Sequence, residues 1–258
     1  MPWFGKIIGG TIGFILGGPI GAVAGLAFGH ISDKMSEGVR TGRRDFYSNY
    51  YNQRLNYTQR AQMTFFVGCF SMLAKIARAD GTVSQEEVRS VENFMDNDLR
   101  LDPISRQSAA RIFSTAQNTS ETFGSYAQQF YLQFRSNPQI LDLMMDILVR
   151  VAAAEGGMSR AEENLILQAV RIFQFNQAKY EAIKNRYSVV TENHYAVLEI
   201  SPDADIEEIK RAYRRLVSEY HPDKISSKGL PEEFMKYASD KFREIQTAYE
   251  TIRKERGF

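Results

Sequence analysis

The chain has 258 residues, of which 43% are hydrophobic and 24% are charged, a composition typical of a folded protein. Its 32 basic and 31 acidic residues nearly cancel, so it lacks the overall positive charge of a nucleic-acid-binding protein. One cysteine excludes an internal disulfide and a cysteine-rich zinc module, and three scattered histidines leave few candidates for a general base. We therefore expect a protein that is not an enzyme, needs no cofactor and binds no nucleic acid.

The first notable segment, residues 7–29, contains no charged residue. As a helix it would be roughly 34 Å long, which is enough to cross a hydrocarbon core of about 30 Å once. A cleaved signal peptide is the alternative, because Ala22-Val23-Ala24 resembles a cleavage site, but the apolar run is long and only Lys6 precedes it. We predict one transmembrane helix within residues 1–30.

Glycine recurs at every fourth position of this segment, and the candidate helix-association stripe consists of Gly9, Gly13, Gly17, Gly21 and Gly25. Inside a bilayer such a stripe lets a second helix approach closely, so it predicts a homodimer through the transmembrane helix. A span that is merely rich in glycine is the alternative. Pro19 lies within the stripe and predicts a local kink.

The charges that flank the segment predict its orientation. Lys34, Arg40, Arg43 and Arg44 follow the span, whereas only Lys6 and the amino terminus precede it. The positive-inside rule then places the short N-terminus outside and the rest of the chain in the cytoplasm. Residues 31–60 are predicted to form a polar juxtamembrane linker, whose tyrosines and arginines either contact lipid headgroups or are solvated.

Residues 61–187 alternate helical hydrophobic periods with short polar breaks, and no strand pattern is evident, so we expect an all-α domain. The predicted helices are Ala61–Ala79, Gln85–Asp98, Pro103–Gln117, Glu121–Arg135, Pro138–Ala154, Arg160–Phe173 and Gln177–Tyr187. Residues 73–87 are similar to residues 148–162, which indicates two related helix–turn–helix units. In each unit a serine lies three residues before a glutamate, as in a capping box.

Acidic residues near both turns allow a second interpretation, and the candidate metal ligands are Asp80, Glu87, Glu155 and Glu162. A calcium EF-hand is excluded, because Ile76 and Arg78 would occupy its first two ligand positions. The paired segments resemble the TerB-like helical domain, a resemblance that implies a divalent-metal site near these turns. Helix capping and a site for a metal or another partner stay open as alternatives.

The C-terminal residues 191–258 predict two amphipathic helices. Asp205 and Glu208 form a capping pattern for a helix that runs to Tyr220, and a second helix follows Pro231. The apolar stripes of the two helices suit an antiparallel hairpin. Phe234 belongs to the second stripe and lies in the first turn of the second helix.

Between these helices lies the tripeptide His221-Pro222-Asp223. Pro222 lacks a backbone donor and disfavours helical angles at His221, so the first helix should end there and display the polar pair at the hairpin tip. Basic side chains occupy the opposite face of the first helix from the apolar stripe: Lys210, Arg211, Arg214 and Arg215.

These features resemble a J-domain, in the residues Tyr195, Leu198, Ile200, Lys210, Tyr213, the run 220–224, Phe242, Ile245, Ala248 and Tyr249. The resemblance implies that the basic helix meets an acidic surface on a DnaK-type ATPase chaperone and that His221-Pro222-Asp223 triggers ATP hydrolysis by that chaperone. The glycine- and phenylalanine-rich linker and the zinc module found in other J-domain proteins are absent from the sequence.

The order of membrane span, TerB-like domain and C-terminal J-domain resembles a family of bacterial membrane-anchored co-chaperones. The family implies a single-pass inner-membrane protein with a periplasmic N-terminus, which recruits a cytoplasmic DnaK-type chaperone to client proteins at the membrane. The alternative is a membrane signalling or scaffold protein whose TerB-like domain binds the principal ligand. The predicted fold class is all-α: a transmembrane helix, a helical bundle and a helical hairpin.

Overall fold

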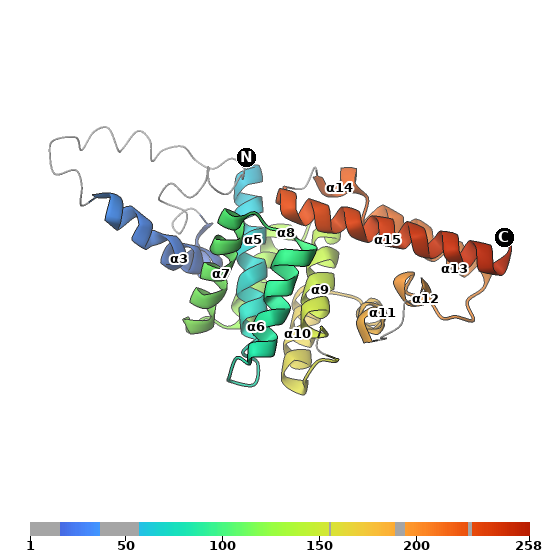
Figure 1. Cartoon of the computed structure of the whole chain (residues 1–258), viewed down its shortest axis with the longest axis horizontal. Helices are drawn as coiled ribbons and strands as arrows, with labels where there is room; N and C mark the ends of the chain where they lie inside the picture. The colour runs from blue at the N-terminus through green and yellow to red at the C-terminus, as the bar shows by residue number, and fades with distance from the viewer. Residues whose placement is uncertain (1–15, 37–56, 155, 189–193, 227–228) are drawn as a thin grey trace.

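The computed structural model describes residues 16–36, 57–154, 156–188, 194–226 and 229–258, and every regular element in these residues is helical, as predicted (Figure 1). The central bundle consists of α5 to α11, residues 57–188. The C-terminal hairpin consists of α12 to α15, residues 194–258, and extends from one side of the bundle. Helix α3, Gly18–Ser36, packs on the other side.

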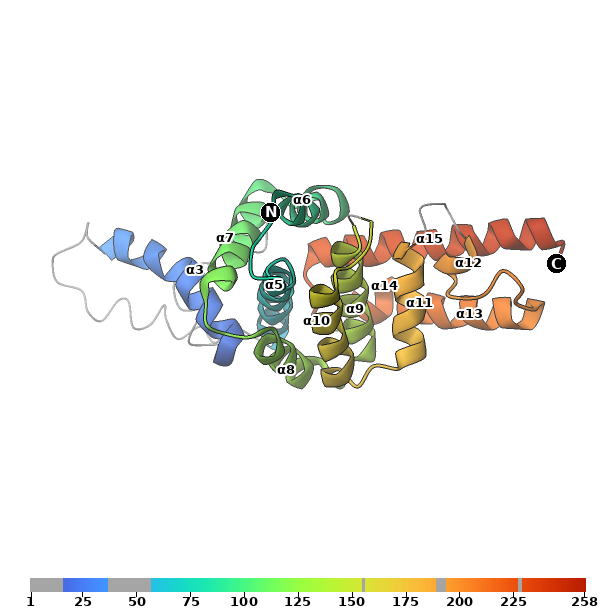
Figure 2. The ribbon, with the colours of Figure 1, turned by 90° about the horizontal axis from the view of Figure 1, so that it is seen from below.

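Helix α5, Tyr57–Ile76, is the centre of the bundle. Every residue from Met63 to Ala74 is buried, and a helix that is apolar on all sides has to be enclosed by other elements. Figure 2 shows α7, α8 and α9 around α5, and all three contact it.

The remaining bundle helices lie close to their predicted positions. They are α6 (Gln85–Asn93), α7 (Pro103–Asn118), α8 (Phe123–Phe134), α9 (Pro138–Ala152), α10 (Arg160–Ile172) and α11 (Gln177–Ser188). The predicted helix 85–98 is divided, because its last five residues form the π-helical turn η1, Phe94–Asp98. Both predicted capping boxes are present, with Ser84 and Glu87 at α6 and Ser159 and Glu162 at α10.

The C-terminal hairpin pairs α13, Ile206–Glu219, with the long helix α15, Glu232–Arg256. The two helices run antiparallel and lie side by side in Figures 1 and 2. The short helices α12, His194–Val197, and α14, Pro222–Ser226, also contact α15. Helix α14 is an addition to the elements predicted from the sequence, although a proline at the first helical position is a common helix start.

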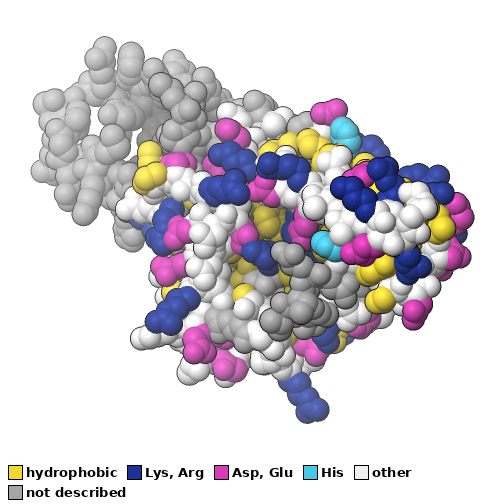
Figure 3. Space-filling view, turned by 45° about the vertical axis from the view of Figure 1, so that its right-hand side comes forward, with side chains coloured by type: hydrophobic (Ala, Val, Ile, Leu, Met, Phe, Trp, Pro, Cys, Tyr) yellow, Lys and Arg dark blue, Asp and Glu magenta, His cyan; other side chains and the backbone are white. Residues whose placement is uncertain are grey.

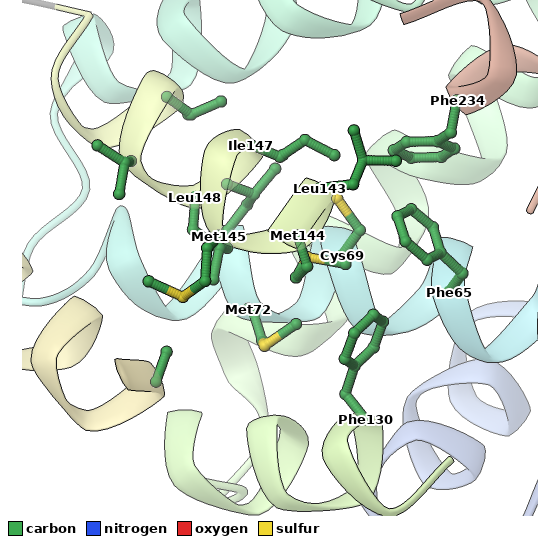
Figure 4. Packing of buried hydrophobic residues seen from close by; sticks show 14 of the residues in the cluster. Phe65, Cys69, Met72, Phe130, Leu143, Met144, Met145, Ile147, Leu148 and Phe234 are labelled. Atoms are coloured by element: carbon green, nitrogen blue, oxygen red, sulfur yellow. The ribbon is translucent and has the colours of Figure 1, made fainter. Parts of the chain in front are cut away.

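Phe234 corrects one prediction, because it packs in the central bundle and not between the hairpin helices. Its ring centroid lies 4.6 Å from that of Phe65 and 6.1 Å from that of Phe66, and the side chain is fully buried (Figure 4). The first turn of α15 lies over the bundle, where consecutive turns of α5 present aromatic rings. The bundle and the hairpin consequently share one hydrophobic core.

The apolar N-terminal segment differs from an uninterrupted helix over residues 7–29. Gly17 and Gly18 adopt left-handed backbone angles, with φ of 60° and 57°, and α3 begins there with Pro19 in its first turn. The Gln129 side chain of α8 binds this helix start: its Oε1 accepts from Ile20 N at 2.8 Å and its Nε2 donates to Gly17 O at 2.8 Å. A residue from a distant helix therefore binds the first turn of α3.

Helix α3 buries Ile20, Val23, Ala24 and Phe28 and contacts α5, α7 and α8. Within the described residues, no helix combines the length and the hydrophobicity that crossing a bilayer requires. Residues 1–15, and with them Gly9 and Gly13 of the glycine stripe, lie outside the described residues, as do residues 37–56 of the predicted linker.

We predict that Phe234→Ala lowers the free energy of unfolding of the full-length chain by about 3–5 kcal/mol, because it removes a fully buried ring from the shared core. Urea unfolding in detergent micelles, followed by circular dichroism, measures the change. Gln246→Ala on the exposed face of the same helix is the control and should stay within about 0.5 kcal/mol. A loss below about 1 kcal/mol for Phe234→Ala would contradict the shared core.

Candidate functional site

The tip of the C-terminal hairpin is positioned by a regular helix pair. Helix α13 begins at a capping box in which Asp205 Oδ1 accepts from Glu208 N at 2.7 Å, as predicted from the sequence. Ile209 and Leu216 are buried against α15, and the rings of Tyr213 and Tyr249 stack at 3.9 Å. These contacts fix α13 against α15. The tip, which follows the last residue of α13, Glu219, therefore has a defined position.

His221 lies between the C-cap of α13, Tyr220, and α14, whose first two residues are Pro222 and Asp223. The Nδ1 atom of His221 accepts a hydrogen bond from the backbone N–H of Asp223 at 3.2 Å. In this arrangement the ring carries its proton on Nε2. The His221 ring also packs edge-on against Phe242 of α15.

The tip is open to solvent. The side chain of His221 is 41% exposed and that of Asp223 is 91% exposed. The tip therefore offers a ring N–H donor and a carboxylate acceptor on a firmly held backbone. This geometry suits recognition by another protein, because the ring orientation is already set by Phe242.

The basic residues of α13 divide into two groups. Arg211 and Arg214 are exposed and form no ion pair with the described carboxylates. Lys210 is partly exposed and pairs with Glu207 at 3.2 Å. Figure 3 shows basic side chains gathered at the end of the molecule that the hairpin forms, with acidic side chains between them.

Arg215, the fourth basic residue, is held in place by two carboxylates. Its guanidinium donates to Glu199 Oε2 at 2.7 Å and lies 3.5 Å from Glu219 Oε2. Burial opposes the charge, but the Glu199 carboxylate raises the pKa of the Arg215 guanidinium above its usual value. Arg215, which the sequence predicts to contact the chaperone, is therefore part of an internal ion-pair network as well as of the basic face.

The network continues into the central bundle through Arg186 of α11. The Arg186 guanidinium donates to Glu199 Oε1 at 2.6 Å and to Asp146 Oδ1 at 2.9 Å, and its side chain is only 3% exposed. Asp146 also accepts from the hydroxyls of Tyr187 at 2.7 Å and Tyr237 at 2.6 Å. The carboxylate of Asp146 thus joins α9, α11 and α15.

Asp146 is fully buried, and nearby cations stabilise its ionised carboxylate. Burial favours the protonated carboxyl, yet Lys241 and Arg186 hold the pKa of Asp146 below its usual value. Lys241 belongs to α15, so one of the two neutralising cations comes from the C-terminal hairpin and the other from the central bundle.

A second ionic contact between bundle and hairpin lies next to the tip. Lys179 of α11 is 2.9 Å from Asp142 Oδ1 of α9 and 3.0 Å from Glu219 Oε1 of α13. Burial raises the pKa of Asp142 to about 6, against the opposing effect of Lys179. Glu219 precedes His221 by two residues, so Lys179 acts close to the tip.

Sequence reasoning missed Lys179, Arg186 and Glu199 as parts of the site. Two aspartates among the buried apolar residues of α9, Asp142 and Asp146, were the available signal, because a buried carboxylate needs a cation. Nothing in the local sequence indicates which cation that would be.

Two of the candidate metal ligands, at the paired turns of the central bundle, cap helices. Glu87 Oε2 accepts from Ser84 N at 2.6 Å and Glu162 Oε2 accepts from Ser159 N at 2.8 Å. Asp80 Oδ1 accepts from Thr82 N, and Glu155 lies outside the described residues. Among the residues that the structure describes, no group of three or more His, Cys, Asp and Glu side chains could hold a metal ion. The geometry favours helix capping.

The glycine stripe is only partly described. Gly21 is buried and Gly25 is partly buried in α3, while Gly17 immediately precedes this helix in a left-handed conformation. The face that contains Gly21 contacts the central bundle in this structure, because Ile20 lies against Gly68 of α5. Association of two chains through the stripe stays a prediction.

Three family models match the chain. The model described as the Co-chaperone DjlA transmembrane domain matches residues 1–46, that of Tellurite resistance protein TerB matches residues 67–185, and that of the DnaJ domain matches residues 193–256. The C-terminal hairpin is accordingly a J-domain, and the central bundle is a TerB-type domain. The match to a transmembrane domain identifies the protein as membrane-anchored.

Curated relatives match over the whole length. Co-chaperone protein DjlA of Coxiella burnetii is 33% identical over 280 residues, which covers 100% of this chain and 99% of the relative. The proteins of the same name from Photobacterium profundum and Shewanella oneidensis are each 30% identical, and the aligned regions cover at least 99% of this chain and 99% of each relative. No solved structure matches the chain. With all three parts matched in the same order and relatives similar from end to end, the chain belongs to the DjlA family of membrane-anchored, DnaJ-like co-chaperones.

Proposed function

We propose that this protein stimulates the ATPase of a cytoplasmic DnaK-type chaperone and recruits that chaperone to client proteins at the inner membrane. The observation that carries the proposal is the exposed His221-Pro222-Asp223 tip on a rigid helix pair. The chain supplies no chemistry of its own in this reaction, because the nucleotide and its hydrolysis belong to the chaperone.

Two features of the hairpin divide the work. The tip supplies the Nε2–H of His221 and the carboxylate of Asp223, which engage hydrogen-bonding groups on the chaperone. The exposed guanidinium groups of Arg211 and Arg214 favour an acidic partner surface and accelerate encounter with it. Stimulation is thus expected to depend on the tip, and the association rate on the basic face.

We predict that His221→Gln and Asp223→Asn each abolish stimulation of the chaperone's ATPase. Both side chains are exposed, so the free energy of unfolding should change by no more than about 0.5 kcal/mol. Single-turnover ATP hydrolysis by the chaperone, measured with and without the full-length protein, gives the result. Asp203→Asn, at another exposed position of the hairpin, is the control and should stimulate normally. Normal stimulation by both tip variants would refute the proposed mechanism.

We predict that the double variant Arg211→Glu and Arg214→Glu associates with the chaperone about tenfold more slowly at low salt, because it reverses the field that steers encounter. The difference should shrink as salt is added. Stopped-flow association kinetics measure the rate. The double variant Lys236→Glu and Lys254→Glu changes the net charge equally on exposed positions of α15, and the proposal requires it to slow association less.

The membrane segment gives the protein its location in this proposal. Residues 34–44 carry the basic charges that favour the cytoplasmic side, and a J-domain meets ATP and its chaperone only in the cytoplasm. Anionic lipid headgroups suit the same basic flank.

The glycine stripe is proposed to pair two chains in the bilayer. Gly9→Leu with Gly13→Leu should keep the segment inserted but weaken association in a membrane reporter assay, and unchanged association would exclude those glycines.

We predict that protease added to sealed right-side-out membrane vesicles leaves residues 31–258 intact. The basic flank holds this part of the chain on the inner side. Immunoblotting of the C-terminal hairpin, before and after the vesicles are opened by detergent, measures protection. Digestion in sealed vesicles would reverse the proposed orientation.

A membrane scaffold is the second candidate function, and a cavity between the paired turns of the central bundle favours it. The cavity has a volume of about 210 Å³, with Leu73 and Val151 among its apolar lining residues and Glu87 and Glu162 among its polar ones. A ligand bound there would make the central domain the principal receptor. Failure of the intact protein to stimulate any DnaK-type ATPase would favour this function over the first.

A further inference from the structure

The activating end of the C-terminal hairpin is attached to the central bundle and is not a free module on a linker. Phe234 lies in the bundle core, and Tyr237 donates from the next turn of α15 to the buried carboxylate of Asp146 at 2.6 Å. Both residues lie at the end of α15 that follows the tip. Any movement of the hairpin relative to the bundle would have to break these contacts first.

Helix α11 of the bundle adds two cations that end on the hairpin beside its basic face. Lys179 reaches Glu219 at 3.0 Å, and Arg186 reaches Glu199 at 2.6 Å. Glu199 and Glu219 are the two carboxylates that hold Arg215 on α13. Each carboxylate therefore links a bundle cation to a residue of the basic face.

The backbone at Glu199 indicates that this arrangement is maintained against a local cost. Glu199 adopts a left-handed conformation with φ of 58°, which is unfavourable for a residue with a side chain. Its side chain is only 2% exposed and accepts from both Arg186 and Arg215. The two charge-assisted hydrogen bonds offset the cost and fix the direction of the carboxylate.

We propose that helix α11 of the TerB-type domain positions the chaperone-activating face of the hairpin, with Lys179 and Arg186 as positioning residues that act through Glu219 and Glu199. The inference rests on the function proposed above and adds the central domain to the activation machinery. Pre-organisation lowers the conformational entropy that the hairpin loses when the chaperone binds. The contribution of α11 is thus to affinity, while the tip residues act on the maximal rate.

Lys179 provides the test, because its partner Glu219 can be changed separately. Arg186 is unsuitable, since its loss would leave two buried carboxylates without their cation. Lys184 is the matched control: it lies five residues further along α11, is similarly exposed, and pairs with Glu163 inside the bundle. Loss of Lys184 removes an ion pair of the same helix and leaves the Lys179–Glu219 and Arg186–Glu199 pairs in place.

The experiment titrates the full-length protein, in detergent micelles, into a DnaK-type chaperone and measures ATPase stimulation for the original chain, Lys179→Met, Glu219→Gln, their combination, and Lys184→Met. Lys179→Met and Glu219→Gln should each raise the half-stimulating concentration about three- to tenfold and leave the maximal rate unchanged. The combination should raise the half-stimulating concentration by less than the product of the two single effects, because both changes remove the Lys179–Glu219 contact, although Lys179 also pairs with Asp142 and Glu219 with Arg215. Lys184→Met should match the original.

Three results would overturn the inference: Lys179→Met within twofold of the original, Lys184→Met as affected as Lys179→Met, or effects of Lys179→Met and Glu219→Gln that multiply. Glu219→Gln leaves the Lys179 contact with Asp142 intact, so it tests the inference even if Lys179→Met folds poorly.

His221→Gln in the same series separates the two proposals. If the original chain and His221→Gln stimulate equally, the proposed function fails; if only His221→Gln loses stimulation and Lys179→Met does not differ from the original, only the positioning role fails.

Discussion

Asp146 places a carboxylate in the middle of a helix whose neighbouring residues are all buried, and an ionised carboxyl is stable there only when cations and hydroxyl donors surround it. In this protein those groups come from α11 and α15, that is, from both the central bundle and the C-terminal hairpin. The groups that stabilise the Asp146 carboxylate therefore connect the central bundle to the C-terminal hairpin. The rings of Phe65 and Phe234 add the apolar part of the same junction.

This junction gives the TerB-type domain a role that a spacer would not have. A J-domain on a flexible linker would present its tip in many orientations, whereas a hairpin that shares a core and a buried ion network with its neighbour presents the tip in one. The tip itself is organised locally, through Pro222 and the His221 contact with Phe242. In the proposed function, recognition of the chaperone and orientation of the recognising surface thus depend on different parts of the chain.

The apolar N-terminal segment faces two environments of similar polarity. Ile20, Val23 and Phe28 are buried against the central bundle in this structure, and the same side chains would be stabilised by lipid. The family model identifies residues 1–46 as a transmembrane domain, while in the described part of the segment α3 begins at Gly18, where Gln129 binds its first turn. The sequence pattern shows neither this contact nor the left-handed angles of Gly17 and Gly18, so it predicted one helix through these residues.

The sequence by itself determined the longer helices of the bundle and hairpin, three capping boxes and the end of α13 before Pro222, because turns, caps and apolar periods depend on residues within a few positions of one another. The tertiary structure alone decided the destination of Phe234, the π-helical turn after α6, the start of α3, and the cations paired with Asp142, Asp146, Glu199 and Glu219. Asp146 and Arg186 are 40 residues apart, and Asp146 and Tyr237 are 91 apart. A local pattern can show that a buried charge needs a partner, but only the packing of whole helices selects which one it meets.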